Sequence, residues 1–353
     1  MGIFRRVLKV LRIIMINMVV LLVLLLFLEV ANRSYRVLAD KGSFFRAEKF
    51  ISPWITTYDY PPPMIGEDGE AYFRHRNVPT SLDKPADAIR IISVGGSTTA
   101  NERPYRAAQV DYPLALQTKL ADAFSGVPVE VLNAGADAYS TAQSLINIEF
   151  RLVEYRPDII LLMHNINDSS VNSFRQGATS DYSNKYIQSY FLNPALQGSL
   201  SFTGLLTQSS LLSKTGLPEY LADKRGDIDS SRGYKFGLHL FKRNLASIAR
   251  ICKMHNIDLV LLSQPYTMEP HRHIRKEAFL EYDEAIATVA REEGVYFIDM
   301  FSKFGHDKQY FVDNFHYSTE GIDRFASILA EELAGIVSAR NEYNRSVNTG
   351  NYE

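Results

Sequence analysis

The chain has 353 residues, 46% of them hydrophobic, and a formal net charge of −2 at pH 7. This length allows one large core or two smaller ones. Lys and Arg are spread along the whole chain, so the composition gives no basic face of the kind that binds nucleic acid. Cys252 is the single cysteine, which excludes an intramolecular disulfide and a thiolate metal cluster. Its apolar neighbours predict a buried position in the core.

An aliphatic run near the N-terminus predicts a membrane-spanning helix. Residues 13–28 are interrupted only by Asn17, and with the apolar residues at 30 and 31 the run approaches the roughly 20 residues that a bilayer span needs. A cleaved signal peptide is the alternative interpretation, but the residues after Leu28 lack the small-residue pattern of a cleavage site. We therefore expect residues 1–31 to form a basic segment and a single transmembrane anchor.

Basic residues flank this run on both sides, so the charge balance alone does not set the orientation of the helix. The short basic N-terminus favours an inside amino end. We expect a single-pass protein of the bacterial inner membrane whose main domain lies on the periplasmic or extracellular side.

The next segment, residues 32–86, contains Pro61-Pro62-Pro63 and shows no sustained helical or strand periodicity. This composition predicts a stalk or leader segment that lies against the main domain. We place the start of the main domain at residue 87.

Short apolar runs then alternate with longer segments of helical spacing. The apolar runs suit strands that are buried on both faces. Such alternation predicts an α/β domain with a central parallel, doubly wound sheet, spanning residues 87–340 and followed by a tail at 341–353. The predicted strands are 89–94, 129–132, 159–163, 259–262 and 295–298, and the predicted helices are 112–124, 142–154, 240–255, 275–293 and 319–339.

One region breaks the alternation. Residues 169–233 contain many Ser, together with Tyr, Gly and Asn, and have only weak helical patterns. A segment this long without regular structure is usually a functional insertion or lid. It follows directly on the third predicted strand, at the edge where open α/β sheets bind their ligands. A surface excursion without a role is the alternative interpretation.

Ser97 follows the first predicted strand, within Val-Gly-Gly-Ser-Thr, where Gly95 and Gly96 allow a tight turn from strand to helix. The hydroxyl is expected at the carboxyl edge of the sheet. A phosphate loop is another interpretation of a glycine-rich turn, but it would contain a lysine that this turn lacks.

Asp313 and His316 lie three positions apart near the C-terminus, in Asp-Asn-Phe-His. A serine becomes a strong nucleophile when a histidine takes its proton, and a carboxylate fixes the tautomer of that histidine. Ser97, Asp313 and His316 are therefore the candidate catalytic residues.

Two further strand ends supply candidate hydrogen-bond donors. Gly135 ends the second predicted strand and would let a bare backbone N–H approach a reacting group, and Asn167 follows the third and could donate its side-chain amide. With the N–H of Ser97 they form a candidate oxyanion hole, although a turn glycine and an Asx-turn asparagine are ordinary alternatives for the two residues taken singly.

Other histidines are weaker candidates. His271 and His273 could form a metal pair, but no third ligand stands at a convincing spacing, so a solvated loop is the preferred interpretation. His164 precedes Asn167 and is interpreted as a hydrogen-bonded residue at a strand end. We expect neither a metal ion nor a cofactor.

The motifs around Ser97, Gly135, Asn167 and His316 resemble the four blocks of the SGNH hydrolases, also called GDSL-type esterases. The resemblance covers about residues 89–339. It implies a flavodoxin-like three-layer α/β/α fold, here preceded by the single transmembrane helix. It also implies that Ser97 is the nucleophile, that His316 is the base and that Asp313 orients the histidine.

Two positions depart from the family pattern. Gly96 stands where the family usually has Asp, and Asn165 stands where its third block begins with Gly. Neither change removes a catalytic group, and the second is expected to reshape the oxyanion turn. We expect Asp168 to hold this turn through hydrogen bonds without acting as a catalytic residue.

The resemblance, taken together with the apolar N-terminal run, predicts a membrane-anchored serine esterase that acts on a small ester or an acylated carbohydrate, such as O-acyl groups on an envelope or secreted polysaccharide. Two alternatives remain open at this point. One is a polysaccharide O-acetyltransferase that uses the same triad, and the other is a non-catalytic glycan-binding module with this fold.

Overall fold

The computed structural model divides the chain into two compact units. The first comprises Met1–Pro53 and Tyr186–Lys224, and the second comprises Trp54–Lys185 and Arg225–Glu353. The described residues are 2–38, 64–65, 71–75, 78–85, 87–101, 108–124, 126–172, 180, 182, 233–269 and 276–348.

Helix α1 (Gly2–Leu38) is the described part of the first unit. Its segment Arg5–Ala31 has a mean hydropathy of 2.9 and is long and apolar enough to cross a membrane. Its large apolar side chains are exposed along the length of this segment. The helix continues beyond the expected end at Ala31. A signal sequence shares this length and composition.

The second unit is built on a five-stranded parallel sheet. In the order of the chain its strands lie side by side as 2-1-3-4-5, which is the flavodoxin-like order. The first four strands in the chain are fully or largely buried and rich in Ile, Val and Leu, as strands covered on both faces must be, whereas the short fifth strand at the edge of the sheet is partly exposed. The five strands are β4 (Ile89–Gly95), β5 (Val129–Gly135), β6 (Ile159–Met163), β7 (Asp258–Leu262) and β8 (Tyr296–Ile298).

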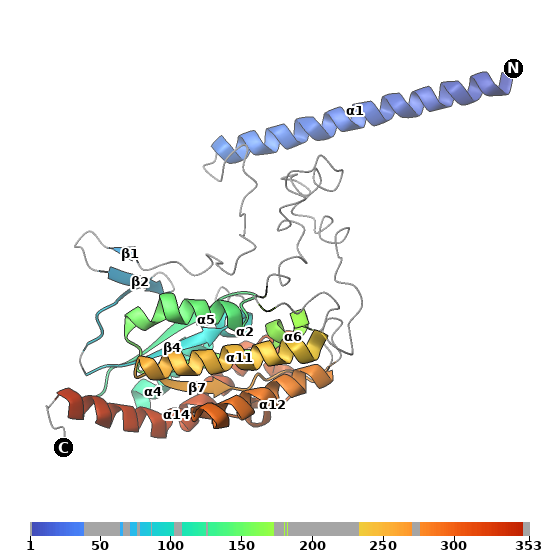
Figure 1. The fold of residues 1–353 in the computed structure, drawn as a ribbon. Coiled ribbons are helices and arrows are strands. Elements are labelled where there is room, and N and C mark those ends of the chain that lie inside the picture. Colours follow the sequence, from blue (N-terminus) through green and yellow to red (C-terminus); the bar gives the residue numbers. More distant parts are fainter. Residues whose placement is uncertain are drawn as a thin grey trace. The chain divides into compact units, whose positions relative to one another are not determined.

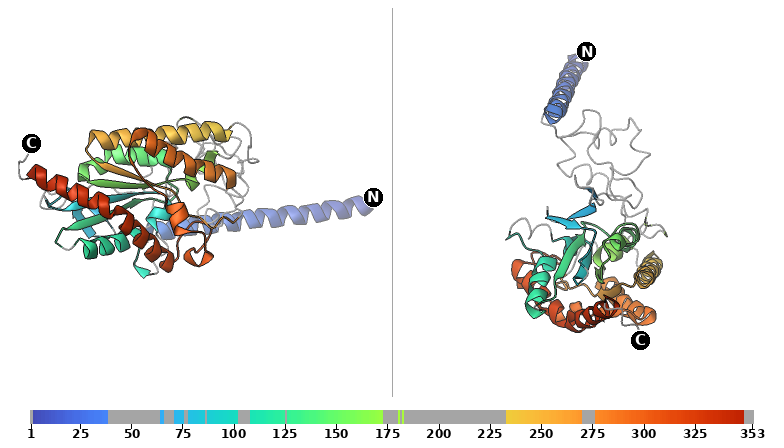
Figure 2. Two further views of the ribbon diagram at one scale, coloured as in Figure 1. Left: turned by 90° about the horizontal axis from the view of Figure 1, so that it is seen from below. Right: turned by 90° about the vertical axis from the view of Figure 1, so that its left-hand side faces the viewer.

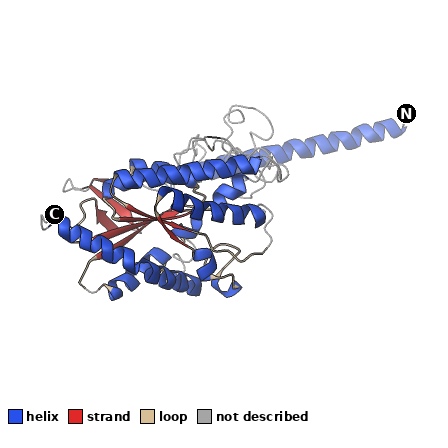
Figure 3. Cartoon of the chain, turned by 60° about the horizontal axis from the view of Figure 1, so that its bottom comes forward, coloured by secondary structure: helices blue, strands red, loops and turns tan. Residues whose placement is uncertain are grey.

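Helices cover both faces of this sheet, so the predicted three-layer architecture is confirmed (Figures 1 and 3). Alternate residues along each strand enter the two cores. Cys252 lies fully buried in the first core, as predicted. One face is covered by α5 (Thr141–Phe150), α11 (Gly233–Met254) and α12 (Lys276–Glu293), and the other by α4 (Tyr112–Ala123), α13 (Met300–Phe304) and α14 (Thr319–Asn348), as the left view of Figure 2 shows.

The structure corrects two sequence expectations. Within residues 32–86, where no strand was expected, β1 (Met64–Ile65), β2 (Ala71–His75) and β3 (Val78–Ser81) form a small antiparallel sheet. These strands have two to five residues and form neither an apolar run nor a strict alternation of apolar and polar residues, so no sequence pattern indicated them.

The second correction concerns the C-terminus. Helix α14 ends at Asn348, so most of the expected tail at 341–353 is helical. Arg340 and Asn344 hold this last part of the helix to the domain through Asp258 and Asp158.

The expected insertion at 169–233 lies almost wholly outside the described residues. Its first four residues complete the short helix α6 (Ile166–Asn172), and its last residue begins α11. The helix expected after the turn at Ser97 is the single turn α2 (Ser97–Ala100), and the end of the predicted helix 142–154 is the separate 3-10 helix η1 (Leu152–Tyr155). The short helix α13 and the 3-10 helix η4 (Lys308–Tyr310) were not predicted.

Candidate active site

The candidate residues gather where the strand order of the sheet reverses. Strands β4 and β6 are neighbours, and Gly95 pairs with Met163 at their carboxyl ends. Ser97 opens α2 directly after β4, and Asn167 lies in the first turn of α6 directly after β6. After β4 the chain continues to its neighbour β5 on one side, whereas after β6 it continues to β7 on the other side. Open α/β sheets leave room for a ligand at the position where the order reverses in this way.

The histidine reaches Ser97 from a turn that is 219 positions away in the chain. His316 Nε2 lies 2.8 Å from Ser97 Oγ, and His316 Nδ1 lies 2.7 Å from Asp313 Oδ2. The side chain of His316 is 30% exposed, which leaves one side of this chain of contacts open to a substrate. The three residues therefore lie in the serine, histidine and carboxylate order that activates a nucleophile.

Asp313 uses its two oxygens for different purposes. Oδ1 accepts the backbone N–H groups of Phe315 and His316, each at 2.9 Å, which closes an Asx-type turn. Oδ2 is left to accept from the imidazole. Partial burial alone would raise the pKa of Asp313, but the hydrogen bonds from His316 and Phe315 outweigh it and hold this pKa well below its usual range. The carboxyl group therefore stays ionised and sets the orientation of the ring.

Asn167 lies against the turn before the serine. Its Nδ2 donates to the carbonyl of Tyr139 at 2.7 Å. A Cβ atom on Gly96 would stand 2.5 Å from Asn167 Nδ2 and 3.2 Å from the Tyr139 carbonyl oxygen. A side chain at position 96 would displace this amide, which gives the departure at Gly96 a physical reason. The N–H of Ser97 has no hydrogen-bond acceptor among the described residues.

Gly135 is more constrained than the sequence indicated. Its N–H donates to Asn133 Oδ1 at 2.9 Å, so this donor is already engaged. A Cβ atom here would lie 2.3 Å from the backbone nitrogen of Ala100 and 2.7 Å from the carbonyl carbon of Thr99. The glycine thus allows β5 to pack closely against α2. Three positions later, Ala138 has a φ of 61° in the left-handed region.

Asp168 is fully buried and holds the first turn of α6 in place. It accepts hydrogen bonds from the N–H and the hydroxyl of Thr141, the latter at 2.6 Å, and from the Tyr182 hydroxyl at 2.9 Å. The prediction that this residue holds the turn through hydrogen bonds is confirmed.

The other histidines contribute no metal site to the described part of the chain. His164 is buried, and its Nε2 lies 2.7 Å from Ser144 Oγ, as expected for a hydrogen-bonded strand end. His271 and His273 lie outside the described residues. Among the residues that the structure describes, no three His, Cys, Asp or Glu side chains are grouped as metal ligands.

Two polar residues near the site were not predicted from the sequence. Gln264 follows β7 and accepts the N–H of Ile166 at 3.1 Å. Asp283 is a buried acid on the inward face of α12 and accepts from Asn165 Nδ2 at 3.0 Å. The sequence contained an indication of each residue, since Gln264 follows the end of a predicted strand and Asp283 interrupts the apolar face of a predicted helix.

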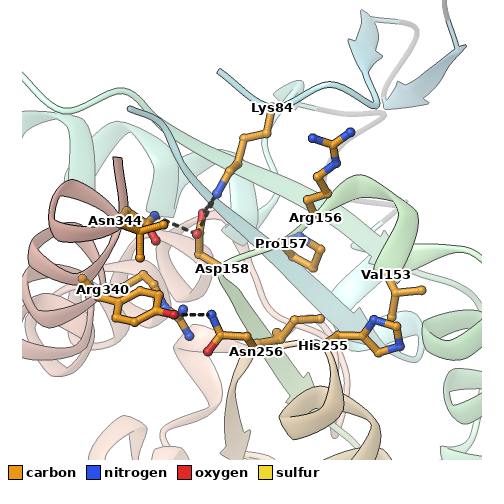
Figure 4. Close-up of a pocket in the computed structure, with 12 residues that line it drawn as sticks. Lys84, Val153, Arg156, Pro157, Asp158, His255, Asn256, Arg340 and Asn344 are labelled. Atoms are coloured by element: carbon orange, nitrogen blue, oxygen red, sulfur yellow. Dashed lines mark hydrogen bonds and ion pairs between the residues drawn. The ribbon is translucent and has the colours of Figure 1, made fainter. Parts of the chain in front are cut away.

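A cavity of about 550 Å³ lies at the opposite edge of the sheet (Figure 4). Asp158 and Asn256 line it at the amino ends of β6 and β7, together with Lys84 and Arg340. Its charged groups pair within the chain, and none of the candidate catalytic residues lines it. It is therefore a site separate from the serine and histidine.

Comparison with known proteins assigns the family. Residues 93–324, more than half of the chain, match the model of the GDSL-like lipase/acylhydrolase family. A search of curated proteins finds no match.

Among solved structures, the chain is similar to a lipase/acylhydrolase from Enterococcus faecalis, with 15% identity, a TM-score of 0.46 and coverage of 70% of this chain and 96% of that one. It is also similar to an acetylxylan esterase from Geobacillus stearothermophilus, with 16% identity, a TM-score of 0.44 and coverage of 70% and 96%. The assignment rests on the family model: the chain belongs to the GDSL-like lipase/acylhydrolase family and is an ester-hydrolysing enzyme.

Proposed function

We propose that the protein is a membrane-anchored serine esterase in which Ser97, His316 and Asp313 form the catalytic triad. The observation that carries the proposal is the 2.8 Å contact between Ser97 Oγ and His316 Nε2, with Asp313 on the far nitrogen of the ring. Geometry of this kind lets the imidazole take the serine proton as the hydroxyl attacks an ester carbonyl.

In the first half-reaction, Ser97 Oγ forms a bond to the carbonyl carbon while its proton moves to His316 Nε2. The tetrahedral intermediate then expels the alcohol, which leaves with the proton from the imidazolium. Asp313 remains ionised and stabilises the positive ring. In the second half-reaction, His316 takes a proton from water as the water oxygen attacks the acyl carbon. The second tetrahedral intermediate then expels Ser97 Oγ, which takes the proton back from the imidazolium, and the acid is released.

The oxyanion needs donors close to Ser97. The N–H of Ser97 and the side-chain amide of Asn167 are the primary candidates, because one amide hydrogen of Asn167 is bound to Tyr139 and the other has no partner among the described residues. The N–H of Gly135 is proposed as a third donor, and it would have to leave Asn133 Oδ1 to act. Each such donor is worth about 3 to 4 kcal/mol in the transition state.

The proposed setting is the outer face of a bacterial inner membrane. The apolar segment Arg5–Ala31 supports an anchor, and the short basic N-terminus favours the orientation that exports the catalytic domain. An O-acyl group on an envelope or secreted polysaccharide is the proposed substrate, because an anchored site meets such glycans. The segment 169–233 contributes four tyrosines, whose rings can stack on sugars.

The test uses the full chain in detergent and a small acetyl ester. We expect the wild type to hydrolyse it and Ser97→Ala to lose this activity, whereas replacement of Ser247, a partly exposed serine on α11, by Ala keeps it. Activity retained by Ser97→Ala contradicts the proposal. Product analysis with an added acceptor glycan separates hydrolysis from acyl transfer, since a transferase would give acylated glycan in place of free acid.

A further inference from the structure

A buried polar cluster lies behind the candidate site, between α6, α12 and the segment 263–269. Asn165 precedes α6, and its carbonyl accepts the N–H of Ser169 at 2.8 Å, so it caps the helix that carries Asn167. Its Nδ2 donates to two acceptors on α12, the carbonyl of Phe279 at 2.9 Å and Asp283 Oδ1 at 3.0 Å. The residue that departs from the family pattern is therefore fixed to α12.

Gln264, in the segment 263–269, also contacts both Asp283 on α12 and the first turn of α6. Its N–H donates to Asp283 Oδ1 at 3.2 Å, and its Oε1 accepts the N–H of Ile166 at 3.1 Å. One carboxylate oxygen thus receives hydrogen bonds from both segments that hold the first turn of α6. Asn167 is the second residue of that helix.

The segment 263–269 also supports the turn that carries the histidine. The ring of Tyr266 stacks on Phe315, with centroids 5.6 Å apart and planes inclined by 16°. The N–H of Thr267 donates to the carbonyl of Asn314 at 3.0 Å. These contacts lie on the two residues directly before His316.

We propose that Asp283 is a positioning residue of the esterase, which fixes the turn bearing Asn167 directly and the turn bearing His316 through the segment 263–269. The expected effect of Asp283 on kcat rests on the proposed function. Asp283 touches none of the proposed reacting groups, so its effect on the reaction passes through Asn165, Gln264 and Tyr266.

The cluster is buried, and this burial limits the hydrogen bonds that its polar atoms can form. Asp283 is 8% exposed, and its Oδ2 has no hydrogen-bond partner among the described residues, like Asn165 Oδ1 and Gln264 Nε2. Buried polar atoms without partners are rare because each costs free energy. The hydrogen bonds that Asp283 Oδ1 accepts from Asn165 and Gln264 are therefore the contacts that hold the cluster together.

Replacement of Asp283 by Leu removes the shared acceptor, and replacement by Asn keeps an acceptor oxygen at Oδ1. We expect Asp283→Leu to lower kcat on the order of 10- to 100-fold with little change in KM, because a small misplacement of a catalytic group has effects of this size. Asp283→Asn should restore most of kcat. Val289→Ala is the matched control, since it removes buried atoms from the same helix and leaves the cluster intact.

Hydrogen exchange on the full chain tests the positioning without any reference to activity. We expect Asp283→Leu, but not Val289→Ala, to increase exchange both at residues 165–169 and at 313–317. Unchanged exchange in these segments, or a kcat equal to that of Val289→Ala, overturns the inference. Failure of the wild type to hydrolyse esters would instead overturn the proposed function and leave the exchange result to decide on Asp283.

Discussion

The two edges of the central sheet both carry charged side chains, yet they use them differently. At the amino edge, Asp158 accepts from Lys84 at 2.6 Å, from Asn344 at 2.8 Å and from the N–H of Arg90 at 2.7 Å. At the carboxyl edge, Ser97 and His316 contact each other and remain partly exposed. The amino edge has the cavity shown in Figure 4, but its charges are paired within the protein.

This difference teaches that a cavity alone does not mark the candidate active site of this protein. Charged groups that pair with one another stabilise the structure, whereas a serine, a histidine and a carboxylate that contact one another in turn can transfer a proton. Substitutions at the two edges should therefore separate activity from stability.

The largest effect is expected for His316→Ala. Loss of the proposed base should reduce kcat on the order of 10⁴-fold or more, because a catalytic triad acts as a unit. Steady-state hydrolysis of an acetyl ester measures it, with circular dichroism to verify the fold. A decrease of less than tenfold would contradict the assignment of His316 as the base. It would also contradict the proposal that the carboxyl edge is catalytic and the amino edge structural.

Asn167→Ala should have the next largest effect, a decrease of about 10²- to 10³-fold in kcat, because it removes an oxyanion donor. Gly96→Ala should act in the same direction, since a Cβ atom at position 96 displaces the amide of Asn167. KM should change little in both variants. An increase in KM with an unchanged kcat would assign Asn167 to substrate binding.

Asp158→Ala should give the opposite pattern at the amino edge. We expect the free energy of unfolding to fall by about 3 kcal/mol, because the largely buried Lys84 ammonium loses its partner, and kcat/KM to stay unchanged. Denaturant unfolding and an ester assay measure the two quantities. Asp83→Ala breaks the exposed pair with Arg156 and is the control, with a loss of less than about 1 kcal/mol. A large loss of activity in Asp158→Ala would show that the edges are coupled.

The smallest effect concerns pH. Burial raises the pKa of Asp283 to about 7, which the hydrogen bonds from Asn165 and Gln264 oppose and the nearby charge of Asp299 reinforces. The folded protein therefore holds this proton at a pH where the unfolded chain has lost it. The resulting stability is complete below the unfolded pKa and is lost as the pH rises through about 7.

From about pH 6 to pH 8 this loss should be on the order of 1 kcal/mol. Tyr266 and Tyr317 also face Asp283, but their pKa values are raised above 10 by burial, so they stay neutral in this range. Asp283→Asn should flatten the dependence, as measured by thermal unfolding at several pH values. An unchanged slope would place the titrating group elsewhere.

The sequence was sufficient to predict the sheet, because strands buried on both faces are continuous apolar runs. It also placed Ser97 and Asn167 at one edge, since residues that follow parallel strands share that edge. The contact of Asn165 with Asp283 spans 118 positions and depends on how α12 packs, so no local pattern indicated it. The bond from Gly135 to Asn133 depends on a side-chain orientation that sequence periodicity does not specify.

The nucleophile can be tested most directly with a fluorophosphonate probe on the full chain, followed by identification of the modified peptide by mass spectrometry. The proposed mechanism predicts one adduct, on Ser97, which forms at the wild-type rate in Asp158→Ala and is lost in His316→Ala. An adduct on a different serine, or ester hydrolysis that persists while Ser97 stays unmodified, would contradict it.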